Sequence, residues 1–225
     1  MIADVLSVIA SSIFLGFKLY VSVSISTNTG VKLFNIIAWL VATKSEIENI
    51  GFKSFGVNLK ISSLARFYNP QKISLSDNIR IDDFCIVSGK VTIGSNVQLA
   101  VYSYVTGCNA GIIMEDFTTL AYGVKIFTDS DDYSGNSLTN PTIPDIYKPG
   151  KISEPILIKK HSIVGANSLI FPGVTLEEGT AIGANSMVIK STQPWTIYVG
   201  SPAKKLKYRS KNILLLEKEY KKNFI

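Results

Sequence analysis

Histidine and cysteine are nearly absent from this chain of 225 residues. His161 is the only histidine, and Cys85 and Cys108 are the only cysteines. Zinc sites draw on clusters of these two side chains, and a disulfide framework needs several cysteine pairs. The sequence therefore predicts that the protein holds no metal and folds in a reducing compartment.

Long uninterrupted apolar runs are missing as well. Within residues 1–25 the apolar stretch is flanked by Asp4 and Lys18, which makes it too short for a membrane span. It also lacks the cationic leader of a signal peptide. We expect a cytoplasmic protein whose residues 1–25 form a helix, either packed on the rest of the chain or in peripheral contact with the inner face of the membrane. A second helix is expected over 31–49, ended by Gly51.

Negative charge is in short supply. Lysine and arginine number 23 against 17 acidic residues, which gives a net charge of +6, and the basic residues crowd toward the C-terminal end. This balance favours an anionic partner such as a phosphorylated small molecule or a membrane surface. Nucleic acid is disfavoured because no stripe of aromatic and basic residues runs along the chain.

What the sequence does contain is a period of six residues. Between 158 and 190 an aliphatic residue recurs at every sixth position: Ile158, Val164, Ile170, Leu176, Ile182 and Val188. This period fits neither an α-helix nor a simple strand. It is typical of a parallel β-helix, in which each hexad is a short strand plus a turn and one aliphatic side chain per hexad points inward.

The same frame starts earlier and is interrupted twice. It begins at Leu75, slips by three residues at Gly111 and stops after Ile126. The polar, proline-containing residues 128–157 then form an excursion, of the kind that carries function on a repetitive scaffold. We expect an N-terminal helical segment over 1–56, a β-helix over 57–200 with the extended loop 128–157, and a basic segment with a C-terminal helix over 201–225.

The segment GVTLEEGTAIGANSMVIK, which ends at Lys190, and the following GSPAKK resemble the hexapeptide-repeat acyltransferases. More narrowly, they resemble the sugar acetyltransferases, which include galactoside and maltose acetyltransferases and enzymes that modify O-antigen and capsule. The resemblance covers about residues 75–210. It implies a mainly β fold, a left-handed parallel β-helix, assembled as a homotrimer with acetyl-CoA as donor and active sites between subunits.

The resemblance also assigns residues to the cofactor. Small residues would let the pantetheine chain approach the backbone, and lysines would pair with the phosphates of CoA. The matching small positions are Ala166, Gly183 and Ala184, and the matching basic positions are Lys190, Lys204 and Lys207.

The sequence departs from the family at the general base. The family places a histidine in the excursion, whereas this chain has Asp131 there, flanked by Asp129 and Asp132. Asp131 or Asp129 would serve as the base if burial and neighbouring charge raised its pKa. Alternatively, the acceptor is an amine, which needs less help than a hydroxyl. The third alternative is that His161 is the base.

Acceptor contacts are expected from the same region. Asn109 matches a position near a family sugar contact, Asp132, Tyr133 and Asn140 lie in the excursion, and Tyr122 is suited to stack on a sugar ring.

The leading hypothesis is an acetyl-CoA-dependent O-acetyltransferase that acts on a sugar of a bacterial surface polysaccharide, such as O-antigen or capsule, or on its precursor. Two alternatives are an N-acetyltransferase of a nucleotide-linked amino sugar and a trimeric scaffold without activity.

Overall fold

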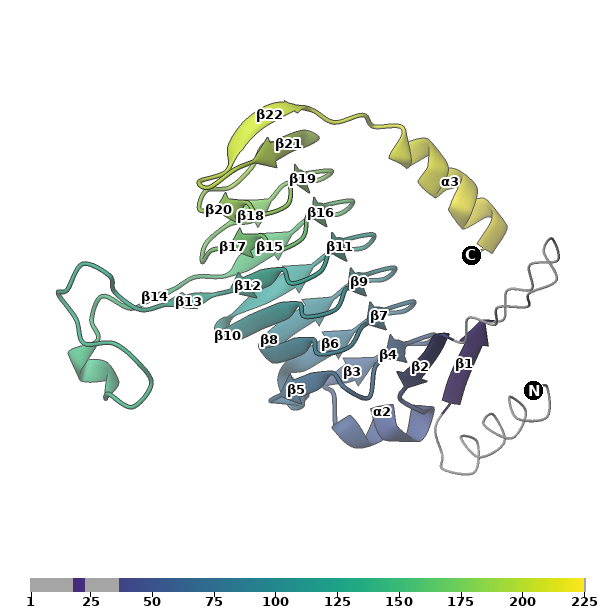
Figure 1. Ribbon diagram of the computed structural model, residues 1–225, viewed down its shortest axis with the longest axis horizontal. Coiled ribbons are helices and arrows are strands. Elements are labelled where there is room, and N and C mark those ends of the chain that lie inside the picture. Colours follow the sequence, from purple (N-terminus) through teal and green to yellow (C-terminus); the bar gives the residue numbers. More distant parts are fainter. Residues whose placement is uncertain (1–17, 23–36, 225) are drawn as a thin grey trace, which may run out of the picture.

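The computed structural model describes residues 18–22 and 37–224. Its main body is a column of stacked triangular coils, seen from the side in Figure 1. A long excursion leaves the middle of the column, and a C-terminal helix lies on the opposite side. The fold is the mainly β, parallel β-helix that the hexads predict.

Three parallel faces make up the column. The first face holds β5 (Arg66–Tyr68), the first halves of β8 (Ile86–Ile93) and β10 (Tyr104–Met114), β12 (Lys125–Phe127), β17 (Leu169–Ile170) and β20 (Met187–Val188). The second face holds β3 (Ser54–Phe55), β6 (Ile73–Leu75), the second halves of β8 and β10, β15 (Ile156–Ile158) and β18 (Thr175–Leu176).

The third face closes each coil. It holds β4 (Lys60–Ile61), β7 (Arg80–Ile81), β9 (Gln98–Leu99), β11 (Thr119–Leu120), β16 (Ile163–Val164), β19 (Ala181–Ile182) and β21 (Thr196–Val199), with β22 (Lys204–Tyr208) added in antiparallel orientation. We call the corner between the first and second faces the first corner, that between the second and third faces the second corner, and that between the third and first faces the third corner.

The inward residues of the hexads form the core. Along the first face, for example, Val87, Val105, Ile126, Ile170 and Val188 are in register on successive coils. Each is at most 1% exposed. Burying an aliphatic side chain of this size contributes about 1.5–3 kcal/mol, so the stacked hexads supply the main stabilisation of the column.

The predicted slip in the repeat lies within β10. Its pairing with β8 shifts register between Thr106 and Cys108 and again between Cys108 and Ile112. The extra residues therefore bulge outward at the first corner, and Val105 and Met114 keep their inward positions. A bulge of this kind re-aims side chains without disturbing the core.

Left-handed backbone conformations recur at the corners. At the second corner Asn58, Asn78 and Asn96 have φ of 55°, 57° and 59°. Asparagine and glycine suit this region because larger side chains clash with the backbone. Bulky residues in the same conformation, such as Tyr102 at 63°, are therefore exceptions that carry a cost.

The N-terminal region differs from the prediction. The expected helix over 31–49 is replaced by β2 (Ile37–Val41), which pairs with β1 (Lys18–Ser22), followed by the short helix α2 (Lys44–Ile50). The run Ile37–Val41 is apolar on consecutive residues, a pattern that does not distinguish a buried strand from a helix. Helix α2 starts where Thr43 and Glu46 form a capping box and ends at Gly51. Most of the helix expected in 1–25 lies outside the described residues.

The predicted C-terminal helix is present as α3 (Ile213–Phe224). The remaining elements are two short 3-10 helices, η1 (Pro70–Lys72) and η2 (Asp145–Tyr147), and two strands of the excursion, β13 (Asp129–Ser130) and β14 (Ile152–Ser153). Helix α3 lies along the second corner, where Tyr220 donates a hydrogen bond to Asn96 at 3.1 Å. None of the helices in the described part of the chain has the length and hydropathy that a membrane crossing requires.

Candidate active site

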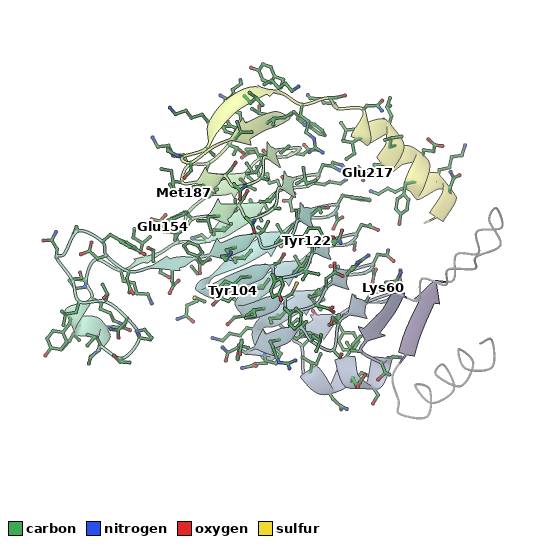
Figure 2. The ribbon with its side chains drawn as sticks, viewed as in Figure 1. Lys60, Tyr104, Tyr122, Glu154, Met187 and Glu217 are labelled. Atoms are coloured by element: carbon green, nitrogen blue, oxygen red, sulfur yellow. The ribbon has the colours of Figure 1, made fainter. Side chains whose placement is uncertain are left out.

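The excursion leaves from the first corner and has a defined base. Strands β13 and β14 pair in antiparallel fashion, with Asp129 opposite Ser153 and Ser130 opposite Ile152. Figure 2 shows Glu154 where the chain returns to the column. The two ends of the excursion are therefore held together, and the coil continues beneath them from β12 to β15.

Asp129 is tied into this base by three side chains. Its carboxylate contacts Lys151 Nζ at 2.9 Å and accepts hydrogen bonds from the hydroxyls of Ser153 at 2.8 Å and Thr128 at 3.2 Å. Partial burial works against ionisation, but these partners outweigh it and lower the pKa of Asp129. Asp129 is thus held as a carboxylate.

The other two aspartates shape the loop backbone. Asp131 accepts a hydrogen bond from Asn140 N at 3.0 Å, and Asp132 accepts from Ser134 N at 2.8 Å and Asn136 N at 3.0 Å. These bonds lower the pKa of Asp132, with the backbone and hydroxyl of Ser134 as the main cause.

The condition under which Asp129 would act as the base, a raised pKa, is therefore not met within this single chain, and the pKa of Asp132 is lowered as well. Sequence proximity suggested mutual repulsion. In the structure each carboxylate instead meets its own lysine, hydroxyl or backbone donors, which favour the charged form.

The bulge of β10 brings two further residues to the first corner. Asn109 lies in the bulge, one coil below the excursion. Cys108 lies beside it and against Asp129, and burial together with that carboxylate raises the pKa of the thiol. The sequence signals this position of Cys108 only through the slip of the repeat in which the residue lies. Tyr133, by contrast, is 94% exposed at the outer part of the excursion.

The small residues assigned to CoA lie at the third corner. Ala166 and Ala184 occupy equivalent turns of neighbouring coils, since Asn185 N donates to Ala166 O at 2.8 Å. Gly183 also has a packing role, because a Cβ there would stand 2.7 Å from Val199 Cγ1.

The lysines assigned to CoA are spread over the last coils. Lys190 follows β20 at the first corner, and Lys204 and Lys207 lie on β22, opposite Val199 and Ile197. All three are exposed. The structure therefore places positive charge at the C-terminal end of the column without gathering the three lysines into one cluster.

His161 lies at the second corner, away from the excursion. It is 1% exposed, its Nε2 is 2.8 Å from Glu217 Oε2 on α3, and its ring stacks on Phe117 at 5.4 Å. Its carbonyl accepts a hydrogen bond from Arg209 at 2.7 Å. These contacts account for the histidine as a packing residue beneath α3, and its predicted role as the base gains no support from them.

The predicted site residues thus fall at different corners of one chain. The acidic residues, Asn109 and Lys190 lie at the first corner, and the small residues lie at the third. The whole first face separates these two groups. A single subunit does not bring them together.

Comparison with known proteins identifies the class. No family model matches the chain. An Escherichia coli dTDP-4-amino-4,6-dideoxy-D-glucose acyltransferase is 39% identical over 183 residues, which cover 80% of this chain and 94% of the relative. A putative lipopolysaccharide biosynthesis O-acetyltransferase of Escherichia coli K12, WbbJ, is 28% identical over 72% of each chain.

A solved structure agrees with these relatives. The N-acyltransferase AntD from Bacillus cereus, crystallised as a variant with dTDP and coenzyme A, is 46% identical and superposes with a TM-score of 0.80 over 82% of this chain and 99% of its own. Parallel coils, the first-corner excursion and these likenesses define an acyltransferase. The chain belongs to the hexapeptide-repeat acyltransferases, as its repeat and closing segment predict.

Proposed function

We propose that this enzyme transfers an acyl group from acyl-CoA to the amino group of a nucleotide-linked amino sugar. The observation that carries the proposal is the chemistry of the excursion, which holds carboxylates with lowered pKa and no histidine. AntD is an N-acyltransferase that was crystallised with dTDP-4-amino-4,6-dideoxyglucose, and the Escherichia coli relative is described as an acyltransferase of the same sugar nucleotide. Both support an amino sugar as the acceptor.

In the proposed reaction the amine nitrogen attacks the thioester carbonyl. An amide bond forms, the carbon–sulfur bond breaks, and CoA leaves as a thiol after the nitrogen has given up a proton. A neutral amine is a strong enough nucleophile to proceed without a dedicated base, whereas a sugar hydroxyl needs one. Asp129 and Asp131 attract the amino group as its ammonium form enters and orient it through their carboxylates. The ammonium releases one proton to solvent before attack, and the proton lost from nitrogen after attack ends on the departing CoA sulfur.

The leading expectation from the sequence, O-acetylation of a surface polysaccharide, has weaker support. It rests on the more distant relative WbbJ. A hydroxyl acceptor also requires a base, and the carboxylates with lowered pKa are poor ones. The proposal therefore favours the amino sugar over the polysaccharide.

The residues of both corners enter one site if subunits share it. In the expected homotrimer, the excursion of one subunit would reach the third corner of its neighbour, where Ala166, Gly183 and Ala184 are suited to the pantetheine chain. Lys190, Lys204 and Lys207 supply the positive charge for its phosphates. Asn109, Asp132, Tyr133 and Asn140 remain proposed acceptor contacts.

A matched pair of acceptors tests the proposal. Release of CoA thiol is measured with dTDP-4-amino-4,6-dideoxyglucose and with the same compound carrying a hydroxyl at carbon 4, each with acetyl-CoA and with 3-hydroxybutyryl-CoA. We expect turnover with the amine at least 100-fold above that with the hydroxyl. Equal or greater turnover with the hydroxyl would contradict the proposal, and a chain that binds no acyl-CoA in calorimetry would instead be a scaffold.

A further inference from the structure

A column of left-handed residues runs up the third corner. On successive coils it contains Phe84, Tyr102, Gly123, Asn167 and Asn185. Their backbone N–H groups donate to the coil below, for example Tyr102 N to Asp83 O at 3.1 Å and Gly123 N to Val101 O at 2.9 Å. The rings of Phe84 and Tyr102 stack with centroids 5.0 Å apart and planes 15° apart. Above this pair, Gly123 leaves its place in the column without a side chain.

The second corner shows what such a glycine is for. Its column passes from Phe117 and His161 to Gly179 and Trp195. The ring of Trp195 fills the place of the missing side chain, since a Cβ on Gly179 would stand 2.4 Å from two ring atoms. Trp195 is only 7% exposed there and lies 6.1 Å from the His161 ring. A glycine in the column thus makes room for the side chain of the next residue in that column.

At Gly123 the next residue of the column, Asn167, takes that place with its amide rather than with a ring. The nearest atom to a Cβ built on Gly123 is Asn167 Oδ1, at 2.4 Å. A hollow of about 660 Å³ opens here, lined by Phe84, Tyr102, Gly123 and Asn167, with Lys125 among the residues at its border. Tyr102 is 63% exposed. The hollow has the size of a small-molecule site and one aromatic wall.

The polar groups around the hollow suit a nucleotide. The Lys125 ammonium donates to Gly123 O at 3.2 Å, which fixes it at the border, and it forms no ion pair with a described residue. Asn167 presents an amide, a group that hydrogen-bonds the edge of a base. A planar base stacks on tyrosine, and a lysine pairs with phosphate. Figure 2 labels Tyr104 and Tyr122, which also line the hollow, on the coils of the column.

We infer that this hollow binds the nucleobase of the sugar-nucleotide acceptor, with the base stacked on Tyr102 beside the Asn167 amide and the diphosphate directed toward Lys125. The inference rests on the proposed function and assigns its acceptor subsite. CoA also carries a base and phosphates. The basic residues suited to CoA, however, lie on β20 to β22 at the C-terminal end, several coils above Tyr102. We therefore assign the hollow to the nucleotide of the acceptor and not to CoA.

The test is titration of the full-length protein with dTDP and, separately, with CoA. We expect Tyr102→Ala to weaken dTDP binding about 5- to 100-fold, the range of one base stack, and Tyr102→Phe to change it less than about twofold because the ring is kept. Gly123→Asn is expected to weaken dTDP binding, since asparagine tolerates the left-handed backbone but its Cβ would displace the Asn167 amide that lines the hollow. CoA affinity should stay unchanged in all three variants.

Two further readouts separate the possible outcomes. Stacking predicts an upfield shift of the thymine methyl proton on binding, lost in Tyr102→Ala, and light scattering reports the mass of each variant. If wild type binds dTDP and Tyr102→Ala binds it equally well, the inference is wrong while the proposed function stands. A lower mass for Tyr102→Ala would mean that this surface is a subunit contact, which also overturns the inference. If wild type binds no dTDP and acylates no amine, the proposed function itself fails.

Discussion

Asp129 illustrates how its neighbours set the chemistry of a residue. Lys151 and the two hydroxyls keep its pKa below the ordinary value although it is partly buried. In the proposed reaction Asp129 must be ionised to hold the amine of the acceptor. The rate should therefore fall at low pH as Asp129 becomes protonated, and the position of this acidic limb follows the pKa of Asp129.

Lys151→Met should therefore move that limb to higher pH. Without the lysine the carboxylate loses its closest positive charge, its pKa rises, and it is protonated at a higher pH. The measurement is kcat/KM for the amino-sugar acceptor between pH 4 and 8. Lys159→Met is the matched control, because it removes an ion pair of 2.8 Å with Glu177 outside the excursion. If the acidic limb of Lys151→Met lies at the same pH as that of wild type, the ionisation of Asp129 does not control the reaction.

Glu217 on α3 is a second residue with a shifted pKa. Burial opposes its ionisation, but hydrogen bonds from Lys160, Lys221 and His161 more than offset this and lower its pKa to about 2. Between about pH 2 and the ordinary value of 4.5 the unfolded chain binds more protons at this group than the folded chain does. Its contribution to stability is therefore complete above that window and is lost as the pH falls through it.

We expect Glu217→Gln to lower the free energy of unfolding by about 1–3 kcal/mol at pH 7, the usual value for hydrogen bonds to a charged group. The difference from wild type should shrink as the pH falls toward 3. Urea unfolding followed by circular dichroism at pH 7, 5 and 3 measures both effects. Glu219→Gln, on the same helix, is the control. A difference that stays constant with pH would show that the carboxylate charge is not what stabilises the contact.

Among the elements, the excursion and the coils are separable. The coil passes from β12 to β15 whatever the loop contains, and β13 and β14 already form a hairpin base. Loop length costs little stability, because closure entropy grows only logarithmically with length. The excursion is thus free to carry chemistry without supporting the column.

Replacing residues 131–151 by Asn-Gly should leave the fold intact and remove activity. A two-residue turn closes the antiparallel pair between Ser130 and Ile152. We expect a melting temperature within a few degrees of wild type and no detectable acyl transfer to the amino sugar, measured by calorimetry and thiol release. CoA binding should remain and serves as the control for folding. Retained transfer would show that the excursion is dispensable.

At the scale of the whole molecule, the proposed site between subunits agrees with the distribution of its residues over two corners. Acidic residues gather at the first corner and small residues at the third, with the first face between them. A site that combines them takes one corner from each of two subunits, which is the arrangement expected of a homotrimer.

Mixing two inactive variants tests this directly. One is the chain with residues 131–151 replaced, which keeps its third corner, and the other is Ala184→Phe, which blocks the third corner but keeps its excursion. Unfolded together and refolded as mixed assemblies, they should regain a measurable fraction of wild-type transfer, because some sites combine two intact halves. Each variant refolded alone is the control. Absence of any recovery, with mixed assemblies verified by mass, would mean that each subunit builds its own site.

The six-residue period by itself determined the parallel β-helix and its core. Every predicted inward residue, from Leu75 to Val188, is buried, since a hexad allows only one solution for stacking aliphatic side chains. The closing segment led to the acyltransferase family. Sequence also located the excursion and the absence of a histidine within it.

Only the tertiary structure decided how the polar residues are used. It paired Asp129 with Lys151, buried His161 beneath α3, placed Cys108 at the first corner and opened the hollow above Tyr102. These contacts join residues far apart in the sequence, across the base of the excursion or between a coil and α3, and loop residues do not follow the hexad period. The N-terminal strand pairing was missed for a similar reason, because a short apolar run does not reveal whether its partner is another strand or its own next turn.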